Sequence, residues 1–259
     1  MKRILLLLLC VSVLTCAACA VSEHPDSPNQ SSSPITAQPS PSALPVPSPF
    51  PSPAPSPSPS PTPVPEISPT PASEPTDDTL VRIQDYLPEV RVALAYATED
   101  NFTGKQIYDF TDAYLRYGTV KKLAVASAEL AEMGLGLLIW DAFRPVSAQA
   151  RLWEVFPDPA YVSPPGTGYR AHCRGSAVDL TLVELSTGNP LVMPTKLDDF
   201  SPLADRDYSD CAADAAENAL LLEQIMVRCG FSPYEAEWWH YADTVEYPIE
   251  EGFDPSAPQ

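Results

Sequence analysis

Histidine is scarce in this sequence, and positive charge is much scarcer than negative charge. Only three of the 259 residues are histidines, and 15 lysines and arginines stand against 34 aspartates and glutamates, which gives a net charge of −19. The phosphates of nucleic acids would repel such a chain, and so would a surface of anionic lipids. Binding to nucleic acid and peripheral attachment to anionic membranes are therefore not expected.

The apolar run at the N-terminus is too short for a comfortable membrane span. It covers residues 4–14, follows two basic residues and is typical of an export signal. Two alanines then precede Cys19, and the pattern resembles a bacterial lipoprotein signal, in which this cysteine becomes the lipidated N-terminus. Cys16 stands where that pattern usually has leucine, so simple cleavage is the alternative. We expect a signal over residues 1–19 and an extracytoplasmic protein anchored to the cell membrane.

Proline, in contrast, is abundant, with 32 residues that lie mostly at or before Pro75. Residues 20–76 consist largely of Pro, Ser, Ala and Thr, so they bury too little apolar surface to offset the entropy of ordering. The composition predicts an extended polyproline II stalk that reaches roughly 150 Å at about 3.1 Å per residue. A ligand for proline-recognition domains is the alternative. His24 lies in this stalk and is not expected to bind metal, whereas residues 77–259 have the length of one catalytic domain.

The hydrophobic pattern of the C-terminal domain mixes helices and strands without a regular βαβ rhythm. Apolar positions at helical spacing predict helices over residues 120–133, 147–155 and 212–227. Shorter apolar runs predict strands over residues 90–94, 136–140 and 176–185, and a hairpin turn at 186–189 that leads to residues 191–193. The expected fold class is α+β, with a small antiparallel sheet flanked by helices.

One short segment concentrates polar chemistry at the start of an expected strand. His172 is followed seven residues later by Asp179, and Gly175 between them permits a tight backbone path. A loop histidine and a strand aspartate can then face one cleft. A surface histidine and a carboxylate bonded to backbone are the alternatives, but a charge beside the half-buried run at 180–182 needs a partner or a metal.

A second segment near the C-terminus carries another histidine, with a glutamate three residues before it. On a helix Glu237 and His240 would share a face, whereas on a flat strand they would point to opposite faces, so a strand in this β-prone segment would have to turn or bulge between them. The sequence leaves these alternatives open. Glutamate beside a metal-bound water is a natural general base, and Glu237 as a metal ligand is the alternative. Trp238 and Trp239 could wall a pocket, although at least one is expected in the core. The two segments together supply enough ligands for a catalytic zinc site with one open position.

Arg144 follows the strand expected at 136–140, in a turn with Asp141. A fixed cation at this place could stabilise the oxyanion of a tetrahedral intermediate. A salt bridge between Arg144 and Asp141 is an equal alternative.

Four stretches of the domain match a known family in order and spacing. They are Y-A-T-E-D-N-F-T-G at 96–104, W-D-A-F-R-P at 140–145, H-C-R-G-S-A-V-D-L-T-L at 172–182 and E-W-W-H at 237–240. The domain resembles the D-alanyl-D-alanine dipeptidases of the vancomycin-resistance type, within the wider family of zinc D,D-peptidases. The resemblance implies the zinc D,D-peptidase fold, which the hedgehog signalling domain shares.

The resemblance also implies roles for individual residues. His172, Asp179 and His240 would bind one zinc ion per chain, with Glu237 as the general base. Arg144 would polarise the scissile carbonyl and stabilise the transition state.

The resemblance also indicates which residues would bind the substrate. Asp198 matches the aspartate that receives the free amino group of the dipeptide, although a loop carboxylate with no such role is the alternative for Asp198 or Asp199. Arg170 stands where the family usually has a substrate-binding serine. Arg170 could pair with the substrate carboxylate, or it could face solvent.

Three cysteines remain in the domain beyond the signal. Cys211 and Cys229 flank an expected helix and would lie about 27 Å apart if it is continuous, too far to bond to each other. Either of them could pair with Cys173, which would leave one free thiol.

The function expected is zinc-dependent hydrolysis of D-Ala-D-Ala to two D-alanines, in the metabolism of cell-wall precursors or fragments. A D,D-carboxypeptidase that trims peptidoglycan stem peptides is one alternative. A zinc-containing domain of the same fold that only binds is another.

Overall fold

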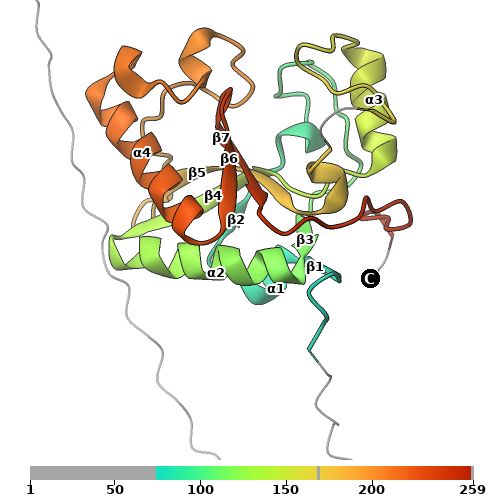
Figure 1. Cartoon of the computed structure of the whole chain (residues 1–259), viewed down its shortest axis with the longest axis horizontal. Coiled ribbons are helices and arrows are strands. Elements are labelled where there is room, and N and C mark those ends of the chain that lie inside the picture. The colour runs from blue at the N-terminus through green and yellow to red at the C-terminus, as the bar shows by residue number, and fades with distance from the viewer. Residues whose placement is uncertain (1–73, 168–169, 258–259) are drawn as a thin grey trace, which may run out of the picture. The chain divides into compact units, whose positions relative to one another are not determined.

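The computed structural model describes residues 74–167 and 170–257, which belong to one compact unit of the chain (Figure 1). The predicted signal, Cys19 and the stalk as far as residue 73 lie outside the described residues. Within the described part, no helix is both long enough and apolar enough to cross a membrane.

A five-stranded sheet forms the centre of the domain, with the strand order β2-β4-β5-β7-β6. Its strands are β2 (Arg91–Val92), β4 (Leu135–Asp141), β5 (Ala177–Glu184), β6 (Phe231–Tyr234) and β7 (Glu237–Asp243). A smaller antiparallel pair joins β1 (Leu80–Arg82) to β3 (Tyr114–Arg116), and the short helix α1 (Ile83–Tyr86) follows β1. The combination of helices with a mainly antiparallel sheet confirms the α+β class.

Three longer helices surround this sheet, and they match the predicted ranges closely. They are α2 (Tyr117–Glu132), α3 (Val146–Val155) and α4 (Ala213–Arg228). Buried apolar side chains of α2 and α4 share one core with Val178, Leu180 and Leu182 of β5. Figure 1 shows α2 running along one side of the sheet, with α3 on the other side. Because side chains alternate along a strand, Asp179 and Thr181 point away from the α2 side.

Two parts of the predicted sheet differ in the structure. The strand expected at 90–94 is reduced to β2, which pairs in parallel with β4 because the chain crosses over through α2 before it returns. The other pairs of the central sheet are antiparallel, as expected. After the hairpin turn, residues 191–193 form no strand, and Pro190 makes only an isolated bridge to Val183. Proline lacks the N–H that would continue the ladder.

Candidate metal centre and active site

Asp179 and His240 are direct neighbours on adjacent antiparallel strands. Asp179 of β5 pairs with His240 of β7, so both side chains project from the same face of the sheet. The His240 Nδ1 atom lies 2.9 Å from Asp179 Oδ1. Both residues are buried. The register of two strands therefore brings together two of the proposed ligands.

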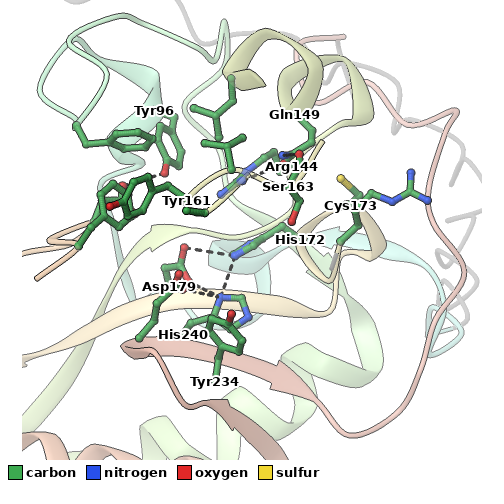
Figure 2. A pocket seen from close by; sticks show the side chains of 18 of the residues that line it. Tyr96, Arg144, Gln149, Tyr161, Ser163, His172, Cys173, Asp179, Tyr234 and His240 are labelled. Carbon is green, nitrogen blue, oxygen red and sulfur yellow. Dashed lines mark hydrogen bonds and ion pairs between the residues drawn. The ribbon is translucent and has the colours of Figure 1, made fainter. Parts of the chain in front are cut away.

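His172 reaches the same point from a 3₁₀ turn, His172–Arg174, immediately before β5. Gly175 ends this turn with a φ of 70°, a left-handed conformation that glycine adopts without strain. A Cβ atom at this position would also lie 2.4 Å from Leu80. The His172 Nε2 atom lies 3.2 Å from His240 Nδ1 and 3.3 Å from Asp179 Oδ2 (Figure 2). The expected path around Gly175 is therefore present.

The other ring nitrogen of His172 determines which nitrogen can bind a metal. Nδ1 lies 2.8 Å from the carbonyl oxygen of Ala142, which can only accept, so Nδ1 carries the proton. The lone pair of Nε2 then faces Asp179 and His240. One ligand atom from each of the three residues lies within 4.8 Å of the others, a spacing that could hold a metal ion.

The charges around the three residues also favour a cation. Burial opposes ionisation of Asp179, but the two imidazoles hold its pKa well below the usual value. Burial likewise opposes protonation of His172, yet the carboxylates of Asp179 and Asp141 raise its pKa. An ionised carboxylate thus lies between two imidazoles, and a divalent cation can replace the protons that they would share.

Glu237 lies beside this cluster because β7 bulges. Pro233 of β6 pairs with Tyr241, but the next residue, Tyr234, pairs with Glu237, so the intervening part of β7 is displaced from a regular ladder. Of the alternatives that the sequence left open, the structure thus has a strand with a bulge. Glu237 Oε2 lies 3.9 Å from His240 Nδ1. Burial, with help from the charge of Asp179, raises the pKa of Glu237 to about 7.

Arg144 makes the predicted salt bridge and also lines the cavity, so the two interpretations of this residue are compatible. Its Nη2 and Nε atoms lie 2.5 and 3.1 Å from Asp141 Oδ2. The Tyr108 hydroxyl donates to Asp141 Oδ1 at 2.6 Å and accepts from Arg144 Nε at 3.2 Å. Asp141 is fully buried and lies opposite Asp179 in the β4–β5 ladder. One buried carboxylate therefore fixes Arg144 to the strand that borders the ligand strand.

Asp198 faces the same cavity from a loop. It is the only non-glycine residue with positive φ among the described residues, at 55°, a conformation that costs about 1 kcal/mol or more. The Tyr96 hydroxyl donates to Asp198 Oδ2 at 2.8 Å. Burial and the charge of Asp179 raise the pKa of Asp198 to about 7. Sequence reasoning assigned no role to Tyr96, although it begins the first of the four matching stretches.

A single cavity connects these groups (Figure 2). It encloses about 840 Å³, its open mouth included. Arg144 and Arg170 line it together with Asp179, Asp198 and Glu237, so cationic and anionic groups face the same space. Arg170 is half-buried and does not simply face solvent. Trp238 and Trp239 both belong to the core, as expected for at least one of them.

The cysteine pairing that the sequence left open is absent among the described residues, where Cys173, Cys211 and Cys229 are all free thiols. The last two flank α4 at opposite ends, as the sequence indicated. Cys173 is buried beside the cavity.

Comparison with known proteins identifies the family to which this chain belongs. A model described as D-ala-D-ala dipeptidase, of the Peptidase_M15 family, matches residues 76–253, which include every site residue named above. The chain belongs to this family. The D-alanyl-D-alanine dipeptidase of Escherichia coli (strain K12) is 37% identical over 172 residues, 66% of this chain and 88% of that protein.

Two further D-alanyl-D-alanine dipeptidases support the assignment. The protein of Streptomyces coelicolor (strain ATCC BAA-471 / A3(2) / M145) is 35% identical and that of Enterococcus faecium is 33% identical. The matches cover 61% and 59% of this chain, and 88% and 85% of those proteins. The Peptidase_M15 match thus spans nearly all of the described domain.

Proposed function

We propose that this domain is a zinc dipeptidase that hydrolyses D-Ala-D-Ala to two D-alanines. The observation that carries the proposal is the convergence of a His-His-Asp cluster, a half-buried glutamate and a fixed arginine on one cavity, within a Peptidase_M15 domain. Turnover of D-Ala-D-Ala by the purified, zinc-loaded chain tests it directly. Release of no D-alanine would reject it.

The residues present fit a catalytic zinc ion. Two imidazole nitrogens and one carboxylate oxygen form a donor set that zinc prefers, and three protein ligands leave a fourth position for water or substrate. His172, Asp179 and His240 would hold the ion. When bound, zinc supplies a Lewis acid for the scissile carbonyl and lowers the pKa of water at the open position.

Glu237 and Arg144 supply the remaining chemistry. Glu237, whose carboxylate lies beside the cluster, accepts a proton from the attacking water and passes it to the leaving amine. The Arg144 guanidinium, held by Asp141 and Tyr108, faces the cavity and stabilises negative charge on the carbonyl oxygen. These two roles distinguish a catalyst from a domain that only binds.

The opposite charges that line the cavity suit a small zwitterion. Asp198 offers a carboxylate for the free ammonium of a dipeptide, and Arg170 offers a guanidinium for its carboxylate. A free dipeptide satisfies both side chains at once. This arrangement supports selectivity for D-Ala-D-Ala over longer peptides.

Replacing Asp198 with asparagine is expected to raise KM for D-Ala-D-Ala about 10- to 100-fold. A hydrogen bond to a charged group contributes about 1.5–3 kcal/mol, and asparagine cannot pair with the ammonium as an anion. For N-acetyl-D-Ala-D-Ala, which has no ammonium, the change should stay below about threefold. Steady-state kinetics on both substrates, with Asp199→Asn as the neighbouring control, measures this. An equal effect on both substrates would contradict the role of Asp198.

The same carboxyl group should also set a pH dependence. Its pKa is raised to about 7 without a bound cation, so the ionised form predominates above that pH. KM for D-Ala-D-Ala should therefore rise as the pH falls through about 7 in the wild type, and Asp198→Asn should lose this dependence.

A second groove favours one alternative, a D,D-carboxypeptidase acting on stem peptides. This groove adjoins the cavity and shares Asp198 and Phe102 with it. Trp140 lines it, as does Thr181, whose buried hydroxyl has no hydrogen-bond partner in the part of the chain described. The groove could hold residues that precede D-Ala-D-Ala. Faster turnover of a stem pentapeptide than of the dipeptide would favour this function.

Export and anchoring are a separate part of the proposal. The signal at residues 1–19 would place a lipid on Cys19, and the stalk at 20–76 would carry the domain at 77–259 outside the cytoplasm. Cells that express the full chain should incorporate labelled palmitate, and Cys19→Ala should abolish incorporation while Cys16→Ala retains it. Membrane-bound, labelled Cys19→Ala protein would contradict the anchor.

A further inference from the structure

Gln149 is a buried polar side chain that the mechanism has not used. It lies on α3, only 5% exposed, five residues after Arg144. Its Oε1 atom accepts a hydrogen bond from Arg144 Nη1 at 2.9 Å. Its Nε2 atom donates to the carbonyl oxygen of Ser163 at 2.8 Å. Both ends of the amide are therefore occupied, one by the proposed oxyanion-binding cation and one by a loop.

That loop forms one wall of the cavity. Residues 159–163 all line it, and Figure 2 shows Ser163 beside Arg144 and Gln149. The Tyr161 ring approaches Phe200 with a centroid distance of 4.3 Å. Phe200 lies two residues from Asp198, so the wall held by Gln149 reaches the segment that carries the proposed ammonium site.

Tyr96 provides a second connection between Asp198 and Arg144. Asp198 accepts from the Tyr96 hydroxyl, and the Arg144 guanidinium lies 5.0 Å from the Tyr96 ring centroid. Arg144 and the Asp198 segment are thus linked by one path through Tyr96 and by another through Gln149 and the loop. Gln149 is the residue that connects Arg144 to the second path.

We propose that Gln149 is a positioning residue that fixes the plane of the Arg144 guanidinium and ties it to the 159–163 wall. Asp141 Oδ2 and the Tyr108 hydroxyl hold the Nε and Nη2 atoms of Arg144, whereas Nη1 bonds to neither of them. The bond from Nη1 to Gln149 adds a second anchor on the other side of the guanidinium. This inference rests on the proposed function, in which Arg144 acts on the transition state.

Gln149→Leu tests the inference in the zinc-loaded chain, because leucine has a similar size and forms no hydrogen bond. We expect kcat for D-Ala-D-Ala to fall about 10-fold, the loss of one hydrogen bond to a charged group, with KM changed less than about threefold. Zinc content and Tm should match the wild type. Gln224→Leu, at an exposed position on α4, is the matched control. A kcat within about twofold of the wild type would overturn the inference.

Gln149→Glu separates the two hydrogen bonds. A carboxylate still accepts from Arg144 Nη1 but cannot donate to Ser163. This variant should therefore recover kcat to within about threefold of the wild type, with KM close to that of Gln149→Leu, since both variants lose the tie to the wall and only Gln149→Glu keeps the bond to Arg144. A kcat as low as that of Gln149→Leu would contradict positioning through Arg144.

A double-mutant cycle provides the decisive result. In an Arg144→Ala background, adding Gln149→Leu should lower kcat by less than about twofold, because the group that it positions is already absent. A full 10-fold loss in that background would show that Gln149 acts elsewhere and would overturn the inference. Failure of the proposed function gives a different result, because the wild-type chain itself would then release no D-alanine. That result would reject both the dipeptidase activity and the positioning role of Gln149.

Discussion

Replacing Glu237 with alanine is expected to lower kcat for D-Ala-D-Ala at least about 100-fold, the size that loss of a general base predicts. The structure places this carboxylate beside the His-His-Asp cluster, in the cavity where an attacking water would lie. Glu237→Gln should be as inactive, since the amide keeps the shape but cannot take a proton. Release of D-alanine, followed under saturating substrate, measures both variants.

The control for this prediction lies two residues away. Glu235 is exposed in the turn between β6 and β7, and Glu235→Ala should retain wild-type activity. Bound zinc should be unchanged in the Glu237 variants, because Glu237 is not proposed as a ligand. Full activity in Glu237→Ala would show that another group is the base, and loss of zinc would favour Glu237 as a ligand.

The raised pKa of Glu237 adds a pH signature. A base must be ionised to accept a proton, so kcat/KM should fall as the pH drops through the pKa of Glu237, about 7 without a bound cation. A divalent cation nearby favours the ionised form and should move this acidic limb to lower pH.

Replacing His240 with alanine is expected to remove activity almost completely, by roughly 1,000-fold or more, since a catalytic metal contributes several kcal/mol. His240 contacts both other proposed ligands, so its loss opens the cluster. A chelator should inactivate the wild type to the same extent, and added zinc should restore the wild type but not His240→Ala. His24→Ala, in the stalk, is the matched histidine control and should stay active.

The opposite pattern would reject the metal mechanism. A wild-type chain that keeps full turnover after exhaustive chelation would contradict it. So would a His240→Ala chain that zinc restores to wild-type activity.

Local sequence patterns were sufficient for the strands and turns that carry the metal cluster. An apolar run predicted β5, and the aromatic segment that forms β7 was recognised as β-prone, with a bulge as one of the ways in which Glu237 and His240 could share a face. Glycine at position 175 indicated the tight turn before β5. These features depend on neighbours in the chain, which a sequence displays directly.

The walls of the cavity could not be predicted in the same way. Tyr96 and Asp198 are 102 residues apart, and their hydrogen bond depends on how two loops pack. The tie from Gln149 to Ser163 depends on the path of an irregular loop. Neither the residues nor their spacing indicates such contacts, because tertiary packing alone brings them together. The short β2 and the missing strand at 191–193 have a related cause, since pairing at a sheet edge depends on tertiary neighbours.

Zinc stoichiometry of the purified chain tests the central claim most directly. Elemental analysis after dialysis should find one zinc ion per wild-type chain and none in a chain carrying His172→Ala, Asp179→Ala and His240→Ala, provided that circular dichroism shows both to be folded. A folded wild-type chain without bound zinc, or stoichiometric zinc in the triple variant, would contradict the account.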